Sequence, residues 1–177
     1  ALPLVAAETG RKYRTALIGS GWWGRNILRC AMEAGESKVV ALCDVDPNQL
    51  DPAVEEVVKL SGDQPKKYKD YRELLAKEKP EIAIVGTPDH WHPLVAIAAI
   101  KAGSHVYVEK PIGHTIKEGR AMVKAARDVG YDGKFYTFYG NAMGAPAALG
   151  EAGLGKVIAV ADWLPNVGTP ESDAFYQ

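Results

Sequence analysis

Short apolar runs alternate with amphipathic stretches along most of the chain. Runs such as Val39–Cys43 and Ile82–Val85 are apolar throughout and short, which is typical of strands buried on both faces of a sheet. A regular alternation of such strands with helical stretches is the pattern of a parallel sheet covered on both faces. We therefore predict one doubly wound, mostly parallel α/β domain over residues 13–140. Its expected strands are 14–18, 39–43, 82–85, 105–108 and 135–139, and its expected helices are 23–34, 53–60, 71–79, 94–102 and 116–129.

Residues 141–177 have a different pattern. The stretch Asn141–Gly155 is rich in alanine and glycine and is expected to hold one weak helix, and Val157–Trp163 is a candidate strand. This is too little chain for a second core of its own, so we predict a short, incomplete C-terminal extension that begins a truncated second domain for substrate binding and oligomerisation. A strand with unpaired edges recruits other chains, and we therefore expect a homo-oligomer.

Composition and charge narrow the class of protein. The 177 residues are 47% hydrophobic and 24% charged with a formal net charge of −1, so neither nucleic acid nor a membrane is expected as a partner. The two cysteines, Cys30 and Cys43, lie in a predicted helix and strand, where we expect core packing instead of a disulfide. The apolar start at residues 1–7 leaves localisation open, with the cytoplasm favoured and export with a removed signal as the alternative.

A glycine-rich turn follows the first predicted strand. Gly19-Ser-Gly21-Trp-Trp-Gly24 satisfies the G-x-G-x-x-G pattern, and its place between a buried strand and a helix makes the match specific. In this pattern Gly19 permits the tight turn, Gly21 lets the backbone approach a pyrophosphate, and Gly24 lets the helix pack on the strand. The pyrophosphate would lie at the helix N-terminus, so the segment predicts a dinucleotide-binding Rossmann fold.

Two neighbouring features refine this prediction. Asp44 ends the second predicted strand, where a carboxylate accepts the ribose hydroxyls and repels a 2′-phosphate, which favours NAD over NADP; Asp46 is close enough to share the role. Trp22 and Trp23 are candidate cofactor contacts, although we expect one of them to pack beneath the turn. A methyltransferase that binds S-adenosylmethionine uses a similar turn and acidic residue, and it stays open as an alternative.

Two further polar segments follow the later predicted strands. Thr87-Pro-Asp-His-Trp-His92 and Glu109-Lys110-Pro111 lie where ligands bind in open α/β sheets. Together with the glycine turn and Asp44, they occur in the order and spacing of the Gfo/Idh/MocA family, which this chain resembles over about residues 13–130. The resemblance implies an oxidoreductase that transfers hydride between a nicotinamide cofactor and a sugar or polyol.

The resemblance also implies roles for individual residues. Lys110 corresponds to the family lysine beside the nicotinamide that contacts the reacting hydroxyl, while Glu109 and Pro111 place the nicotinamide end and fix the turn. The residues Thr87, Pro88 and His92 correspond to the loop that lines the cofactor. We expect no metal site, because the remaining histidines and cysteines lack ligand spacing.

The chain departs from the family in its second half. The family's general acid/base histidine belongs to the second domain, but the last histidine here is His114. Hydride transfer needs a base within hydrogen-bond reach of the substrate, so catalysis by this chain alone is in doubt. The alternative is a catalytically silent dinucleotide-binding or interaction module.

Overall fold

The computed structural model describes residues 10–131, 135–138 and 157–160. Contacts divide the chain into two compact units, Ala1–Gly130 and Tyr131–Gln177, which are described separately. The first unit contains β1 (Tyr13–Ile18), α1 (Trp22–Glu33), β2 (Ser37–Cys43), α2 (Pro47–Ser61), β3 (Lys66–Tyr68), α3 (Tyr71–Glu78), β4 (Ile82–Val85), the 3₁₀ turn η1 (Asp89–Trp91), α4 (His92–Lys101), β5 (His105–Val108) and α5 (Ile116–Asp128).

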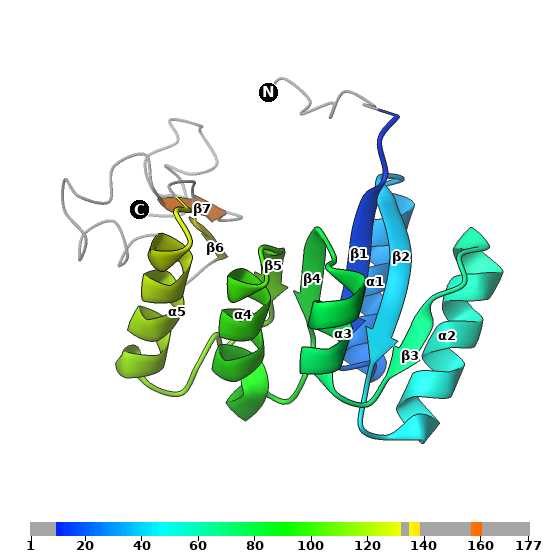
Figure 1. The fold of residues 1–177 in the computed structure, drawn as a ribbon, viewed down its shortest axis with the longest axis horizontal. Helices are drawn as coiled ribbons and strands as arrows, with labels where there is room; N and C mark the ends of the chain where they lie inside the picture. The colour runs from blue at the N-terminus through cyan, green and yellow to red at the C-terminus, as the bar shows by residue number, and fades with distance from the viewer. Residues whose placement is uncertain (1–9, 132–134, 139–156, 161–177) are drawn as a thin grey trace, which may run out of the picture. The chain divides into compact units, whose positions relative to one another are not determined.

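The first unit is built on a five-stranded sheet in the order β3-β2-β1-β4-β5, in which every pairing is parallel. The strand order reverses between β1 and β4, and α1 and α3 lie on opposite sides of the sheet (Figure 1). This confirms the predicted doubly wound α/β fold. In such sheets ligands bind beyond the carboxyl ends of the strands at the reversal, which here is the end of β1 and β4.

Each face of the sheet has its own apolar core. Along β1, Ala16 and Ile18 contribute to the core on the side of α3 and α4, whereas Leu17 contributes to the core on the side of α1 and α2. Ala16 and Leu17 are both fully buried, which confirms that the strand is covered on both faces. The two cores fix the strand ends, and with them the turns that carry the candidate site.

Two features of the α2–β3 region differ from the sequence prediction. The predicted helix at 53–60 begins six residues earlier, because Pro47 suits the first helical position and the Asp46 side chain accepts a hydrogen bond from the Asn48 N–H as N-cap. Pro52 therefore lies inside the helix and does not precede it. The short strand β3 was not predicted, since Lys66 and Lys67 are exposed and only Tyr68 is buried.

The cysteines correct another expectation. Both are free, and Cys43 is buried in β2 as expected, but Cys30 lies on the exposed face of α1. The prediction of core packing is therefore wrong for Cys30. Burial, together with nearby carboxylates, raises the pKa of the Cys43 thiol to about 12.

The second unit contains the parallel strand pair β6 (Phe135–Phe138) and β7 (Val157–Val160), in which Phe135 pairs with Val157. Strands were predicted at both places, but the strand at 135–139 was expected in the sheet of the doubly wound domain, whereas β6 pairs with β7. The expected continuations to 139 and 163 lie outside the described residues, as do the weak helix at 141–155 and the domain boundary at 140. Among the helices that are described, none is long and apolar enough to cross a membrane.

Candidate functional site

The turn after β1 is packed so closely at Gly19 and Gly24 that neither position has room for a side chain. Gly19 has a φ of 92°, in the left-handed region that favours glycine, and a Cβ there would lie 2.6 Å from the carbonyl carbon of Gly86. A Cβ on Gly24 would fall on the carbonyl oxygen of Gly19, and one on Gly86 would lie 2.8 Å from the Cα of Gly24. The turn after β1, the start of α1 and the end of β4 therefore interlock through backbone atoms.

Gly21 has a different environment from these three glycines. It is the N-cap of α1 with a φ of −64°, and no described atom lies within 4 Å of the position a Cβ would take. Side chains of Asp46, Asp70 and Thr115 cap α2, α3 and α5, but none of the described side chains caps α1. Bare N–H groups at the positive end of a helix bind phosphate, so this open turn fits a dinucleotide pyrophosphate.

Asp44 lies at the end of β2 with its carboxylate turned toward the same turn. Its Oδ2 accepts a hydrogen bond from the Ser20 N–H at 2.7 Å, and its Oδ1 accepts one from the Asp46 N–H at 3.0 Å. Each oxygen keeps a second lone pair, so the group can also accept ribose hydroxyls. Asp46 caps α2 through its bond with Asn48 at 2.9 Å, and the two aspartates therefore have different surroundings.

The two tryptophans of the turn lie on its outside. Trp22 is 69% exposed and Trp23 49% exposed, with ring centroids 5.3 Å apart. The prediction that one of them packs beneath the turn is wrong, because the backbone of Gly19, Gly24 and Gly86 fills that space. The Trp23 side chain instead donates a hydrogen bond to the carboxylate of Glu109, so it joins α1 to the turn after β5.

Glu109 is the link between β5 and the turn that carries Lys110. Its Oε1 accepts from the Tyr107 hydroxyl at 2.9 Å, and its Oε2 accepts from the Lys110 N–H at 3.0 Å. Burial raises the pKa of the Glu109 carboxyl, but the hydrogen bonds from Trp23, Tyr107 and Lys110 and the nearby ammonium outweigh it, so the pKa lies below its ordinary value. Glu109 is thus a fixed anion at the start of this turn. The Lys110–Pro111 peptide bond that follows is cis.

His92 joins the loop after β4 to the turn after β5. It is 2% exposed, with Nδ1 2.7 Å from the carbonyl oxygen of Pro111 and Nε2 2.8 Å from that of Thr87. The hydroxyl of Thr87 is buried and has no hydrogen-bond partner among the described residues, and Pro88 beside it is exposed. An unpartnered buried hydroxyl at a crevice is a group that a bound cofactor can satisfy.

A second histidine contact links the same two segments at the surface. His114 Nε2 lies 3.1 Å from Asp89 Oδ2, and the hydrogen bond and charge from His114 hold the pKa of Asp89 below its usual range despite desolvation. No local pattern in the sequence indicates this pair, because the two residues are 25 positions apart in the chain. Within the described ranges no three histidine, cysteine, aspartate or glutamate side chains are grouped as metal ligands.

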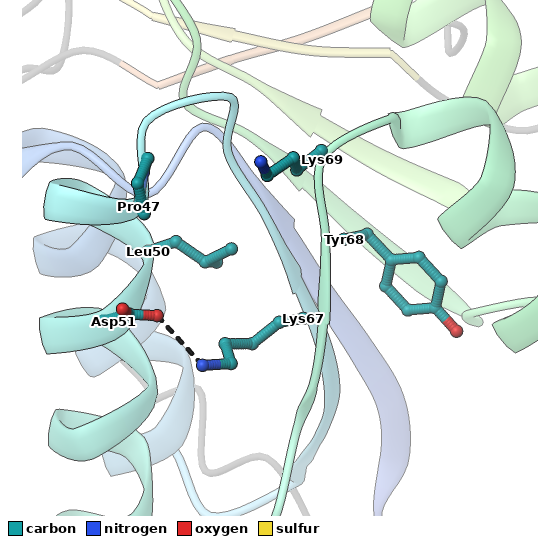
Figure 2. Close-up of a pocket in the computed structure, with 6 residues that line it drawn as sticks. All are labelled: Pro47, Leu50, Asp51, Lys67, Tyr68 and Lys69. Atoms are coloured by element: carbon teal, nitrogen blue, oxygen red, sulfur yellow. Dashed lines mark hydrogen bonds and ion pairs between the residues drawn. The ribbon is translucent and has the colours of Figure 1, made fainter.

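An open hollow of about 320 Å³ lies between α2 and β3 (Figure 2). Asp51 and Lys67 form an ion pair of 3.0 Å across it, and Pro47 and Lys69 lie near its end at the carboxyl edge of the sheet. The Asp44 N–H donates to the Tyr68 carbonyl at 3.1 Å, so the hollow adjoins the end of β2. β3 and β5 are the two opposite edge strands of the sheet, so the hollow lies away from Lys110.

An open parallel sheet with an uncapped helix after a glycine turn, and with a carboxylate at the end of the second strand, defines a dinucleotide-binding domain. Residues 13–134 match the oxidoreductase family with an NAD-binding Rossmann fold, and the chain belongs to this Gfo/Idh/MocA family. NAD is accordingly its cofactor, which decides against the methyltransferase alternative.

Curated relatives share the same part of the chain. A "glycosyl hydrolase family 109 protein 1" of a Shewanella species is 35% identical over 119 residues, and an alpha-N-acetylgalactosaminidase of Shewanella oneidensis is 36% identical over 119 residues. Both matches cover 64% of this chain and 26% of the relative. The chain therefore spans about a quarter of the length of these relatives.

Solved structures match about two thirds of the chain. The WlbA dehydrogenase of Bordetella pertussis, in complex with NADH and UDP-GlcNAcA, has a TM-score of 0.60 and 29% identity over 68% of this chain and 36% of that one. The myo-inositol 2-dehydrogenase of Lactobacillus plantarum has a TM-score of 0.57 and 29% identity over 67% and 34%.

Proposed function

We propose that this chain is the cofactor-binding part of an NAD-dependent oxidoreductase that acts on a hydroxyl or carbonyl group of a sugar or polyol. The observation that carries the proposal is the position of Lys110. It lies directly after β5, on a turn that Glu109 holds from one side and His92 from the other. Related structures of a nucleotide-sugar dehydrogenase and an inositol dehydrogenase support this substrate class.

The chemistry divides between the cofactor and the residues of the turn. Oxidation of a secondary alcohol releases a hydride, which bound NAD⁺ takes up, and a proton. Lys110 is exposed and forms no ion pair within the described residues, so its ammonium is available to stabilise negative charge on the reacting oxygen. Glu109 fixes the turn from which that ammonium extends.

The residues described so far include no acceptor for the proton of the reacting hydroxyl. No histidine follows His114 in the sequence, and the described residues place no histidine other than His90, His92, His105 and His114. We propose that the acceptor is supplied by residues outside this chain's first unit. A chain without it would bind the cofactor and show no turnover, which is the silent-module alternative.

Titration with NADH and NADPH tests cofactor binding directly. We expect NADH to bind in preference to NADPH, and Asp44→Ala to weaken NADH binding about ten- to a hundredfold, because one hydrogen bond to a charged group contributes about 1.5–3 kcal/mol. The same substitution removes the repulsion between the carboxylate and a 2′-phosphate, so the preference for NADH over NADPH should become smaller. Nicotinamide fluorescence and heat would be followed, with Asp51→Ala, in the hollow between α2 and β3, as the control.

Absence of binding by either nucleotide would overturn the proposal for this chain. If the chain binds NADH, turnover would be measured with a panel of sugars and polyols, with Lys110→Ala alongside the unmodified chain. Binding with NADH formation that Lys110→Ala abolishes supports the oxidoreductase. Binding without turnover on any of them supports the silent module.

The names of the curated relatives favour a second candidate, the cleavage of a glycoside with NAD as a resident cofactor. A reaction that oxidises and later reduces the same sugar returns NAD to its starting state and gives no net NADH. Release of nitrophenol from 4-nitrophenyl α-N-acetylgalactosaminide without accumulation of NADH would favour this candidate. NADH accumulation without nitrophenol release would favour the dehydrogenase.

A further inference from the structure

His92 has hydrogen-bond geometry that separates it from the cofactor. Its ring is almost fully buried, and both nitrogens face backbone carbonyl oxygens, those of Pro111 at 2.7 Å and Thr87 at 2.8 Å. A carbonyl oxygen only accepts, so both contacts are hydrogen bonds when both ring nitrogens carry hydrogen. With both nitrogens engaged in this way, the ring has no polar atom left for a ligand.

We propose that His92 is a positioning residue, which sets the direction of Lys110 through the carbonyl group of Pro111. This inference rests on the proposed function and changes the role expected of His92 from the sequence, where it was a residue lining the cofactor. The family match does not assign this role, which follows from the two contacts of the ring.

The backbone around Lys110 has one anchor on each side. On the amino side, its N–H donates to Glu109 Oε2 at 3.0 Å, and Glu109 in turn accepts from Trp23 and Tyr107. On the carboxyl side, the next carbonyl group is held by His92. The Lys110 side chain itself is exposed. These two anchors therefore hold the backbone from which the side chain extends.

The second ring contact, between Nε2 and the Thr87 carbonyl oxygen, ties His92 to the loop after β4. Thr87 follows β4, and a Cβ on Gly19 would lie against the Thr87 region because the glycine turn packs on it. Through Nε2, the ring is therefore held against the segment that interlocks with the pyrophosphate turn. His92 thus sets the nicotinamide-end turn relative to the pyrophosphate-end turn, and its loss should affect one end of the cofactor more than the other.

Two conservative substitutions separate the two contacts. An asparagine amide can place its nitrogen near the position of Nδ1, and a glutamine amide near that of Nε2, so His92→Asn retains the donor to Pro111 and His92→Gln retains the donor to Thr87. The exposed His105, at the opposite end of β5, provides the matched control His105→Asn. Each variant would be titrated with NADH and with ADP-ribose, which lacks the nicotinamide, and its melting temperature recorded.

We expect His92→Gln to weaken NADH binding about three- to tenfold with ADP-ribose binding unchanged, which corresponds to the loss of one hydrogen bond. His92→Asn should restore NADH binding to within about twofold of the unmodified chain, on the same hydrogen-bond scale. Equal behaviour of the two variants, or equal loss of NADH and ADP-ribose binding, would overturn the positioning role. Failure of the unmodified chain to bind ADP-ribose would instead contradict the proposed function.

A measurement on the unmodified chain covers the case in which the variants do not fold. With the imidazole nitrogens labelled with ¹⁵N, His92 should give a ring N–H signal that exchanges slowly with solvent, because its ring is buried between two backbone carbonyl oxygens. The exposed His105 should give none. A spectrum in which His92 shows no protected ring N–H would contradict the buried contacts on which the inference depends.

Discussion

Gly21 and Gly24 stand three residues apart in one motif, yet a methyl group would meet different surroundings at each. At Gly24 it would fall on the carbonyl oxygen of Gly19 and lie 3.3 Å from the Leu17 side chain, whereas at Gly21 it would meet no described atom within 4 Å. The close packing at Gly24 serves the fold. The open space above Gly21 serves the pyrophosphate that the turn is expected to bind.

Alanine at the two positions should therefore separate folding from binding. We expect Gly24→Ala to lower the free energy of unfolding by about 2 kcal/mol or more, since backbone atoms cannot yield to it as a side chain can. Gly21→Ala should melt within a few degrees of the unmodified chain and still lose most of its NADH affinity, because the methyl group occupies the ligand's space. Thermal melts and NADH titration of both variants would show this. A Gly21→Ala chain that binds NADH normally would contradict the role given to Gly21.

The residues of the site differ in how far sequence alone could place them. Gly19, Asp44 and Glu109 follow strands directly, so their place at the sheet edge was predictable from local pattern. The double contact of His92 depends on two loops that meet only in the folded domain, and the same is true of the pair Asp89–His114. The bond from Trp23 to Glu109 was missed because the indole was expected beneath the turn.

Among the elements, α3 is joined to the sheet by a carboxylate in its last turn. Glu78 is 8% exposed and accepts hydrogen bonds from the Tyr68 hydroxyl at 2.5 Å and the Lys66 ammonium at 2.9 Å, both on β3. These two bonds, with the nearby Arg14, hold the pKa of Glu78 below its ordinary value despite desolvation. They attach the short edge strand β3 to the rest of the unit.

The lowered pKa of Glu78 makes a prediction about acid stability. A carboxyl whose pKa is lower in the folded state stabilises the fold above its unfolded pKa, and this contribution disappears as the pH falls through the folded pKa. Glu78→Gln should therefore cost about 1–2 kcal/mol at neutral pH, with the difference from the unmodified chain shrinking below about pH 4. Urea unfolding at pH 7 and at acid pH would measure it. A constant difference at all pH values would contradict the assignment.

Most elements of the first unit followed from the apolar pattern, because buried strands such as β4 and amphipathic helices such as α5 have clear periods. β3 did not, since only one of its three residues is buried and its place at the sheet edge depends on Glu78 and on pairing with β2. The start of α2 was displaced because Pro47 and Pro52 were taken as breaks. The Asp46 N-cap and the burial of Leu50 and Ala53 stabilise the helix across both prolines.

At the scale of the whole molecule, the chain brings the turns after β1, β2, β4 and β5 to one edge of a single sheet. These are the turns that we expect to contact the cofactor, within a chain that covers about a quarter of its curated relatives. We therefore expect the first unit to bind the cofactor by itself. Substrate binding and proton transfer are what the remaining parts of a longer relative would add.

Self-association is the prediction that belongs to this scale. A two-stranded pair such as β6 and β7 has an outer edge on each strand, and such edges recruit further strands. We expect a homo-oligomer, seen as a sedimentation coefficient that rises with protein concentration. Ending the chain at Gly130 should give a species whose sedimentation no longer depends on concentration. A monomer at all concentrations for the full chain would refute the prediction.

The hydrogen bond from Trp23 to Glu109 has an optical consequence. Indole emission overlaps the absorption band of reduced nicotinamide, and Trp22 and Trp23 lie on the turn that is expected to hold the dinucleotide. Excitation of these rings should therefore transfer energy to bound NADH, while NAD⁺, which lacks that absorption band, should leave the emission unquenched. The crevice thus contains its own fluorescent probe, sensitive to the redox state of whatever nicotinamide it holds.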